Sequence, residues 1–392
     1  MAAGPRTYFD YNASAPMLDC ARERMFEIYS QTSNASSVHY EGRAGRKSIE
    51  QARVSVASLV GAKPANVIFT SGATEAANHA LSPVLKAGGQ ELDVSKLYVS
   101  ATEHPCVLQG GRFPENRIIK LPVNDCGILD FDAMNGALQG HDYAEGAPMV
   151  ALQLANNETG VIQPVREVAD IVHEHDGFLV VDAVQGLGKS KVSVAELGAD
   201  FMFVSSHKIG GPQGAGALIL ANGSLSPVSL IGGGGQENYH RAGTENIAAI
   251  AGFGVACEWQ SVNLNNNIKK SGVRDSIEAG LSTISLETGN GVAAPVFFGK
   301  TENRIPNTTC FSVPGIRAET ALVALDLDGI SVSSGSACSS GKVKQSHVLE
   351  AMGASPEEMA GALRVSIGWQ STEEEADKFL NAWKTIVGRM AA

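Results

Sequence analysis

Short apolar runs alternate with amphipathic helical patterns from about Val67 to Leu220, and this alternation restricts the fold more than any other feature of the sequence. Strands that alternate with helices build a mostly parallel sheet covered by helices on both faces. The expected strands are Val67–Thr70, Leu97–Ala101, Met149–Leu154, Phe178–Val181, Phe201–Val204 and Ala215–Leu220. The stretch Lys86–Lys96 is interpreted as a surface loop. The sequence therefore predicts an α/β protein with a mostly parallel central sheet.

The pattern changes beyond about Gly254, where a long polar helix precedes a second set of strands. Strand-like segments near 308–313, 329–333 and 363–367 are interleaved with helices, and Ser371 with Glu374 has the spacing of a capping box that opens the last helix. A chain of 392 residues is also too long for one compact core. We therefore expect a large domain at 16–254 and a second, smaller α/β domain made of 1–15 and 255–392.

Charge and hydropathy limit the partners of the chain. A formal net charge of −11 gives no general field that attracts nucleic acid or anionic lipid. No apolar stretch approaches the roughly 18 residues of a membrane-spanning helix, and the first residues lack the pattern of a signal peptide. The six cysteines include no Cys-x-x-Cys pair, which argues against a zinc site and a disulfide framework. We expect a cytoplasmic protein without a bound metal, nucleic acid or membrane.

Polar or titratable side chains follow five of the expected strands. In open α/β sheets, ligands bind outside the carboxyl ends of the strands. The segments at these ends are Ser71–Glu75, Thr102–His104, Asn156–Glu158, Asp182–Gln185 and Ser205–Lys208. The sequence therefore indicates one site at one edge of the sheet.

Three of these segments suggest a specific chemistry. The Ser71–Glu75 turn opens a helix, and its free amides suit a phosphate, although an ordinary capped helix has the same pattern. Asp182 ends a buried strand and needs a cationic partner, such as a protonated ring nitrogen, unless it caps the next helix. Partial burial of Lys208 would lower the pKa of its amine and allow it to form an imine, whereas a surface lysine is the simpler alternative.

Two further residues stand out in the second domain. Cys338 lies within the polar run 333–341, which contains nothing that could bury it, and Lys342 and Lys344 would favour its thiolate. A reactive thiol on a loop is the interpretation preferred over a fortuitous surface cysteine, and the other five cysteines are expected to be inert. Arg364 interrupts an apolar strand, where it would bind either a substrate carboxylate or a structural acid.

Taken together, these residues resemble the cysteine desulfurases of the bacterial nitrogen-fixation and iron-sulfur type. The resemblance covers almost the whole chain, and its motifs are Tyr8–Ala13, Thr70–Glu75, Glu103–His104, Asn156–Gly160, Asp182–Gln185, Ser206–Lys208, Arg241–Thr244, Ser333–Cys338 and Arg364. It implies the aspartate-aminotransferase-like fold of pyridoxal phosphate enzymes and a homodimer with shared active sites. It also implies conversion of L-cysteine to L-alanine, with the sulfur passed through an enzyme persulfide to an acceptor protein for iron-sulfur clusters or other products.

The resemblance further implies a role for each site residue. Lys208 would bind pyridoxal phosphate covalently and move the alpha proton of the substrate, His104 would stack on the ring and assist, and Cys338 would attack the sulfur. Asp182 would pair with the pyridinium nitrogen, and Gln185 would hydrogen-bond the phenolic oxygen. The remaining cofactor contacts would be Ala73, Thr74, Asn157, Ser205, His207 and, from the neighbouring subunit, Thr244. The substrate contacts would be Asn157, Arg364 and Asn34.

Three other functions stay open at this point. A selenocysteine lyase would use the same scaffold, and a transaminase would need the cofactor but not Cys338. An inactive scaffold protein in sulfur transfer would need neither. One motif departs from the family pattern: Ala35 follows Asn34, where the family usually has proline.

Overall fold

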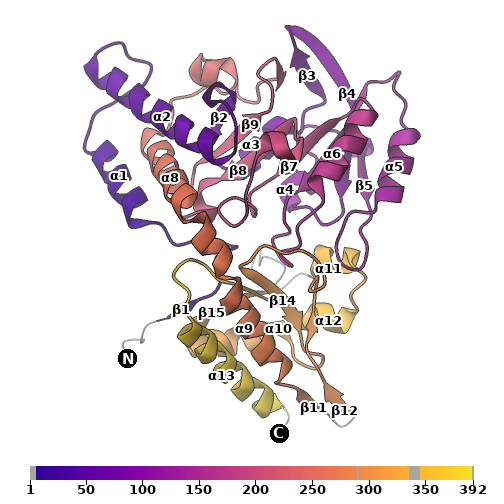
Figure 1. The fold of residues 1–392 in the computed structure, drawn as a ribbon. Helices are drawn as coiled ribbons and strands as arrows, with labels where there is room; N and C mark the ends of the chain where they lie inside the picture. The colour runs from indigo at the N-terminus through magenta and orange to yellow at the C-terminus, as the bar shows by residue number, and fades with distance from the viewer. Residues whose placement is uncertain (1–5, 289–290, 335–344, 391–392) are drawn as a thin grey trace.

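The structure is a computed structural model that describes residues 6–288, 291–334 and 345–390. Figure 1 shows a large part built on a wide sheet and a smaller part below it, with α8 and α9 running from one to the other. Within the described residues, the large sheet has the strand order β10-β3-β4-β6-β7-β8-β9-β2, with β5 paired to β4 outside this path. Its strands are β2 (Val67–Thr70), β3 (Val84–Ala87), β4 (Gln90–Ser100), β5 (Ile118–Leu121), β6 (Ala147–Gln153), β7 (Phe178–Asp182), β8 (Phe201–Ser205), β9 (Gly216–Leu220) and β10 (Leu225–Pro227).

The direction of the strands places five carboxyl ends at one edge. Strands β5, β4, β6, β7 and β8 pair in parallel, while β9 is antiparallel to both β8 and β2. Strand β2 therefore runs in the same direction as β8. The segments that follow β2, β4, β6, β7 and β8 all begin at this edge, as the sequence predicted.

The expected surface loop at Lys86–Lys96 is wrong. Strands β3 and β4 form an antiparallel hairpin in which Ala87 pairs with Gln90. The two turn residues, Gly88 and Gly89, have φ values of 57° and 88°, the positive angles that a two-residue hairpin turn requires. The hairpin lies near an end of the sheet, and its residues 86–93 are all exposed or only partly buried, so the apolar signal is weak there.

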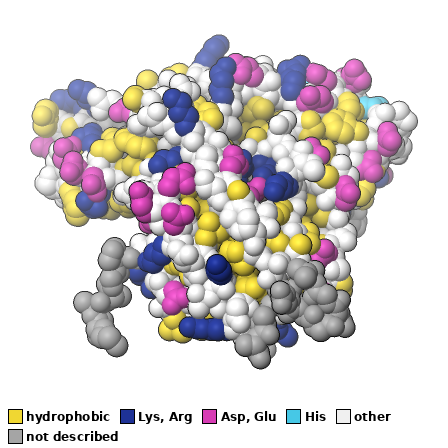
Figure 2. All heavy atoms as spheres, turned by 60° about the horizontal axis from the view of Figure 1, so that its bottom comes forward, with side chains coloured by type: hydrophobic (Ala, Val, Ile, Leu, Met, Phe, Trp, Pro, Cys, Tyr) yellow, Lys and Arg dark blue, Asp and Glu magenta, His cyan; other side chains and the backbone are white. Residues whose placement is uncertain are grey.

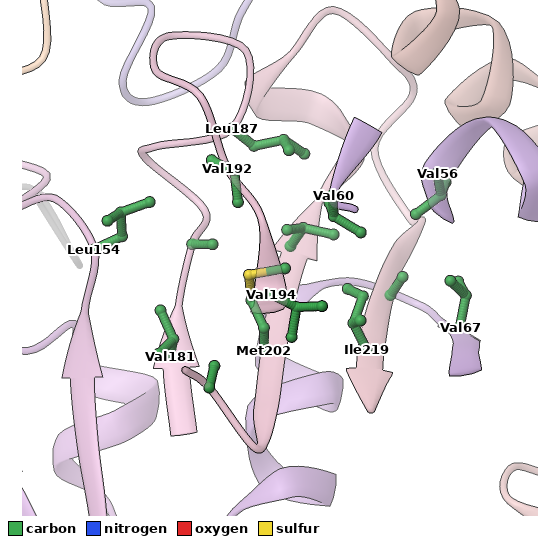
Figure 3. Close-up of a cluster of buried hydrophobic side chains, with 14 of the residues drawn as sticks. Val56, Val60, Val67, Leu154, Val181, Leu187, Val192, Val194, Met202 and Ile219 are labelled. Carbon is green, nitrogen blue, oxygen red and sulfur yellow. The ribbon is translucent and has the colours of Figure 1, made fainter. Parts of the chain in front are cut away.

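Helices cover both faces of the large sheet. They are α1 (Asp19–Tyr29), α2 (Tyr40–Leu59), α3 (Ala73–Ala80), α4 (Pro105–Leu108), α5 (Phe131–Gln139), α6 (Val165–Glu174), α7 (Val194–Leu197) and α8 (Ile247–Lys269). Figure 3 shows Val56 of α2 and Val60, the residue after this helix, lying against the sheet residues Val67, Met202 and Ile219. The opposite face buries a second cluster that includes Ala76 and Ala77 of α3. A sheet buried on both faces is rigid, and it fixes the strand ends that carry the site.

The smaller part surrounds an antiparallel sheet of order β13-β14-β17-β16. Its strands are β13 (Val296–Phe297), β14 (Thr308–Ser312), β16 (Ser333–Ser334) and β17 (Leu363–Ser366), with the separate pairs β1 (Thr7–Tyr8) with β15 (Ile330–Ser331) and β11 (Leu286–Thr288) with β12 (Gly291–Ala293). Its helices are α9 (Ser271–Ser282), α10 (Ala318–Leu327), α11 (His347–Ala351), α12 (Pro356–Gly361) and α13 (Glu373–Met390).

The N-terminal segment packs into the smaller part, because Phe9 is fully buried among Phe311, Phe379 and Trp383. We propose the same division that the sequence led us to expect, with a large domain at 16–254 and a smaller domain made of 1–15 and 255–392. Helix α8 is continuous through the boundary at 254, so the division would pass through a helix and not a flexible linker.

The start of the last helix is displaced by one residue from its prediction. Thr372 and Glu375 form the reciprocal pair, in which the Glu375 N–H donates to Thr372 Oγ1 at 3.3 Å and the Thr372 N–H donates to Glu375 Oε2 at 3.2 Å. The predicted pair of Ser371 and Glu374 is therefore wrong. Ser371 does not cap the helix, because its Oγ accepts the N–H of Gly368 at 3.0 Å and so belongs to the turn before the helix.

The surface carries both signs of charge. On the face shown in Figure 2, lysine and arginine side chains are interspersed with aspartate and glutamate side chains. Over the described ranges, none of the helices combines the length and the apolar character that a membrane crossing requires.

Candidate functional site

A cavity of about 630 Å³ opens at the carboxyl edge of the large sheet. Its walls come from the turns after β2, β4, β6, β7 and β8, from the N-terminal segment 12–14, and from Ser333 and Arg364 of the smaller part. The predicted site residues that line it are Ala73, Thr74, His104, Asn157, Asp182, Gln185, Ser205, His207, Lys208 and Arg364. Residues scattered over almost 300 positions of the chain therefore share one pocket.

Three predicted residues are not among the cavity-lining residues. Asn34 is exposed on the loop between α1 and α2, where its Oδ1 accepts the N–H of Ser36 at 2.9 Å. Thr244 is exposed just before α8. Its proposed role is in the active site of a neighbouring subunit, so exposure in one chain agrees with that role. Cys338 lies outside the described residues.

Lys208 enters the cavity directly after β8. Its Nζ donates to the main-chain oxygens of Asn12 and Ala13, at 2.5 and 2.9 Å. Burial, together with the positive charge of Arg364, lowers the pKa of the Lys208 amine to about 8. Because only a neutral amine is a nucleophile, this site makes Lys208 far more reactive near neutral pH than a surface lysine.

Asp182 is the last residue of the neighbouring strand β7, and only 8% of it is exposed. Its Oδ1 accepts the N–H of Val184 at 2.9 Å. Burial raises the pKa of Asp182 to about 6, so the carboxylate is still ionised at neutral pH. Glu103 is fully buried nearby, and burial followed by the charge of Asp182 raises the pKa of Glu103 well above its usual range. Asp182 is therefore the acid that carries negative charge into the cavity.

The first turn of α3 provides an anion site beside these groups. The free amides at Ala73 and Thr74 open the helix, and a Cβ at Gly216 would lie 2.7 Å from the carbonyl carbon of Gly72, so only glycine lets β9 pass this turn. The acidic residue in this turn, Glu75, is neutralised, because its Oε1 accepts from Arg241 Nε at 2.8 Å. An anion can therefore approach the helix without repulsion.

His207 and Ser205 border the same anion site from the end of β8. Burial, and then the charge of Lys208, lowers the pKa of His207 to about 4, so the imidazole is neutral at physiological pH. His207 Nδ1 lies 3.3 Å from Ser14 Oγ of the N-terminal segment. A neutral imidazole and a hydroxyl can both donate to an anion without adding charge.

His104 forms the N-cap of the short helix α4. The Cys106 N–H donates to His104 Nδ1 at 3.2 Å, which places the proton of a neutral ring on Nε2. Desolvation, and then the charge of Lys208, lowers the pKa of His104 to about 4. Cys106 also lines the cavity, with its Sγ 3.0 Å from His104 Nδ1. Burial raises the pKa of the Cys106 thiol, so this cysteine is not a nucleophile at neutral pH.

Arg364 forms a structural ion pair, one of the two roles that its sequence allowed, and it also lines the cavity. Its Nη2 donates to Asp10 Oδ1 at 2.8 Å, and its Nη1 donates to the main-chain oxygen of Asn157 at 3.0 Å. The buried Nε has no partner among the described residues. The structural ion pair therefore exists, and it uses one of the five N–H donors of the guanidinium, so others remain for a ligand. The role of Arg364 in binding a substrate carboxylate stays a prediction.

The strand-end argument missed Asn12 and Lys189. Asn12 accepts from Lys208 and Gln185 through its main-chain oxygen, and its Nδ2 donates to the main-chain oxygen of Asn157 at 3.1 Å. It belongs to the first motif of the resemblance, which was the only signal for it. Lys189 lies four residues after Gln185 and donates a hydrogen bond to it. Nothing in the sequence predicts its burial, because a lysine in a glycine-rich turn is usually exposed.

Comparison with known proteins agrees with this geometry. The model of the aminotransferase class-V family matches residues 7–379. The cysteine desulfurase IscS of Dictyoglomus turgidum is 36% identical to the chain over 98% of its length and 95% of the relative. The cysteine desulfurase IscS 1 of Archaeoglobus fulgidus is 33% identical over 98% of the chain and 97% of the relative.

A solved structure supports the same conclusion. The NifS-like protein from Rickettsia africae superimposes with a TM-score of 0.84 at 30% identity, over 98% of this chain and 99% of that chain. This match confirms the expected aminotransferase-like α/β fold. With a family match over nearly all residues and relatives of similar length, the chain belongs to the class-V aminotransferase family.

Proposed function

We propose that this enzyme is a cysteine desulfurase that uses pyridoxal phosphate to convert L-cysteine to L-alanine and transfers the sulfur to Cys338. The observation that carries the proposal is the pairing of a reactive amine with a buried carboxylate at adjacent strand ends, Lys208 after β8 and Asp182 at the end of β7. The names of the relatives support the substrate, and the class-V family supports the cofactor.

The residues present fit pyridoxal phosphate. A buried carboxylate with one main-chain donor, Asp182, suits a protonated ring nitrogen, and the first turn of α3 suits the phosphate. The amine of Lys208 would hold the aldehyde carbon in the same cavity. When bound, the cofactor supplies an electron-withdrawing ring that stabilises negative charge at the substrate alpha carbon.

The side chains would then divide the chemistry. Lys208 Nζ removes the proton from the alpha carbon, and Asp182 keeps the proton on the ring nitrogen. His104 lies on the cavity wall, where the N–H at Nε2 can donate a hydrogen bond to a reacting group and so assist proton transfer. The thiolate of Cys338 would form a bond to the substrate sulfur while the bond from that sulfur to the beta carbon breaks, which leaves a persulfide on Cys338. Protonation of the beta carbon and return of a proton to the alpha carbon would then give alanine.

The decisive experiment supplies L-cysteine and a reducing thiol to the purified protein and measures alanine and sulfide together. Equal amounts of the two products are expected. A transaminase would not form alanine and sulfide in equal amounts, and a scaffold protein would form neither product. Comparing the rates on cysteine and selenocysteine separates a desulfurase from a selenocysteine lyase. Protein that stays colourless with added pyridoxal phosphate would refute the proposal.

We further propose a homodimer whose sites are shared. The exposed position of Thr244, outside the cavity of its own chain, supports this proposal, because an exposed residue can face a neighbouring subunit as the family resemblance implies. A sulfur-acceptor protein would receive the sulfur, and a cytoplasmic location would keep the thiols reduced. Sedimentation of the purified protein tests the dimer directly.

The charge of Asp182 gives one prediction. The substitution Asp182→Asn keeps the shape of the side chain but removes the carboxylate, so the ring nitrogen should lose its proton. Alanine formation should fall by about 10²-fold, the usual cost of one buried electrostatic contact in a transition state. Steady-state alanine formation measures this effect. Asp170→Asn, at an exposed carboxylate on α6, is the matched control, and equal rates in the two variants would contradict the assignment.

The lowered pKa of Lys208 gives a second prediction. Below pH 8 the ammonium form predominates and cannot attack an aldehyde, and above pH 8 the free amine predominates. The rate at which the cofactor-free protein gains its visible absorption with added pyridoxal phosphate should therefore rise with pH, with a midpoint near 8. Nα-acetyl-lysine, whose side-chain amine is free, should react with the same reagent with its midpoint near pH 10.5. Coinciding midpoints would show that the cavity does not activate Lys208.

A further inference from the structure

Lys189 is a buried lysine for which the proposed chemistry has no use. It lies in the turn after β7, and only 8% of it is exposed. Its Nζ donates to Gln185 Oε1 at 2.5 Å and to Asn12 Oδ1 at 3.1 Å. Both partners line the large cavity, so Lys189 stands directly behind the wall of the site.

The surroundings of Lys189 are unfavourable for a charge. The charged groups that act on it are the cations Lys208 and Arg364, and Lys270 lies on the wall of a small cavity of about 20 Å³ that Lys189 also lines. Across the described ranges no carboxylate pairs with it. Burial, and then Lys208 and Arg364, lowers the pKa of Lys189 well below its usual range. The amine of Lys189 thus has two hydrogen-bond acceptors beside it, Gln185 Oε1 and Asn12 Oδ1.

The contact with Gln185 decides how its amide is oriented. The oxygen and nitrogen of a glutamine amide have nearly the same shape, so donors and acceptors around them fix the orientation. An N–H of Lys189 faces Oε1, and on the other side Nε2 of Gln185 donates to the main-chain oxygen of Asn12 at 3.0 Å. The second N–H of Nε2 is then left for the cavity that Gln185 lines.

The contact with Asn12 extends the same control to the reactive amine. Asn12 Oδ1 accepts from Lys189 and from Asn307 Nδ2, the latter at 3.0 Å, which immobilises the residue. The main-chain oxygen of the immobilised Asn12 accepts from Lys208 Nζ. One buried lysine therefore supports two groups that face the cavity.

We propose that Lys189 is a positioning residue that aims an amide N–H of Gln185 at the phenolic oxygen of pyridoxal phosphate and, through Asn12, holds the amine of Lys208 in place. This inference rests on the proposed function, because it requires that cofactor in the cavity. It adds a residue that touches neither cofactor nor substrate and acts through its neighbours.

The test compares Lys189→Met with the wild-type protein. Methionine keeps the length of the side chain but donates no hydrogen bond, so Gln185 is free to reverse its amide. Pyridoxal phosphate should bind about tenfold more weakly, and its visible absorption maximum should move. The melting temperature of the cofactor-free protein should change little, because replacing a buried amine by an apolar side chain offsets the loss of its two hydrogen bonds. Lys189→Arg, which keeps a donor, should retain the wild-type absorption maximum.

Two further variants separate positioning from general stability. Lys270→Met makes the same exchange on the wall of the small cavity without touching Gln185 or Asn12, and it should leave binding and absorption unchanged. Gln185→Met should lose affinity as Lys189→Met does, and the double variant Lys189→Met with Gln185→Met should lose little more, because both changes remove the same contact.

The outcomes are distinct. An unchanged absorption maximum and affinity in Lys189→Met would overturn the inference, and so would additive losses in the double variant. A lower melting temperature with unchanged absorption would reveal a structural lysine and would also overturn it. If the wild-type protein does not bind pyridoxal phosphate, the proposed function fails as well, whereas a wild-type protein that binds normally isolates the failure to Lys189.

Discussion

The substitution Lys208→Ala is expected to lower alanine formation from L-cysteine by about 10⁴-fold or more, because it removes both the covalent attachment of the cofactor and the base that moves the alpha proton. Among the residues that the structure describes, the titratable groups near Lys208 are poor substitutes for it. The two histidines on the cavity wall, His104 and His207, lie beside Lys208 and are poor bases, since burial lowers the pKa of each to about 4. Lys189 faces Gln185 and Asn12 and is not among the residues that line the large cavity.

The variant should remain folded, because Lys208 contributes only two hydrogen bonds to main-chain oxygens of the N-terminal segment. The melting temperature of the cofactor-free protein checks this point. Alanine formation measured over a range of cysteine concentrations gives the effect, and the visible absorption of the loaded protein should change with it. Lys191→Ala is the control, since Lys191 is an exposed lysine close in sequence. If Lys208→Ala retained more than a tenth of the wild-type rate, the proposed catalytic role of Lys208 would be wrong.

The substitution Cys338→Ala should lower sulfide release by about 10³-fold or more while the protein keeps its bound cofactor and its colour. The other cysteines support this expectation. Burial raises the pKa of the thiols of Cys106, Cys257 and Cys310, which keeps these three protonated at neutral pH. Ser333, which precedes Cys338 by five positions in the sequence, lines the cavity.

The control for this prediction is Cys20→Ala, which replaces an exposed cysteine on α1 and should leave sulfide release unchanged. Mass spectrometry of the wild-type protein after incubation with cysteine, without a reducing thiol, should find one additional sulfur atom on the peptide that contains Cys338. Sulfide release by Cys338→Ala at the wild-type rate would indicate another acceptor. In that event a lyase that releases the chalcogen without an enzyme thiol becomes the better description.

The strand pattern of the large sheet could be predicted because its central strands are buried on both faces. Continuous apolar runs such as Val67–Thr70 and Phe178–Val181 have no other stable position, and the structure contains strands at both. The polar residues that follow each strand then predicted one site at one edge, because parallel strands align their carboxyl ends. The hairpin β3–β4 was missed because its residues 86–93 are exposed or only partly buried, so the continuous apolar run of a central strand is absent there.

Other features of the site depend on contacts between distant segments. Sequence alone determined which residue types gather at the sheet edge, since strand direction and burial follow from local apolar patterns. Only the tertiary structure brought Asn12 of the N-terminal segment against Lys208 and Gln185, and placed Lys189 behind them. The pKa values of Lys208 and Asp182 were decided there too, because desolvation depends on every segment that covers a group and not on its neighbours in the chain.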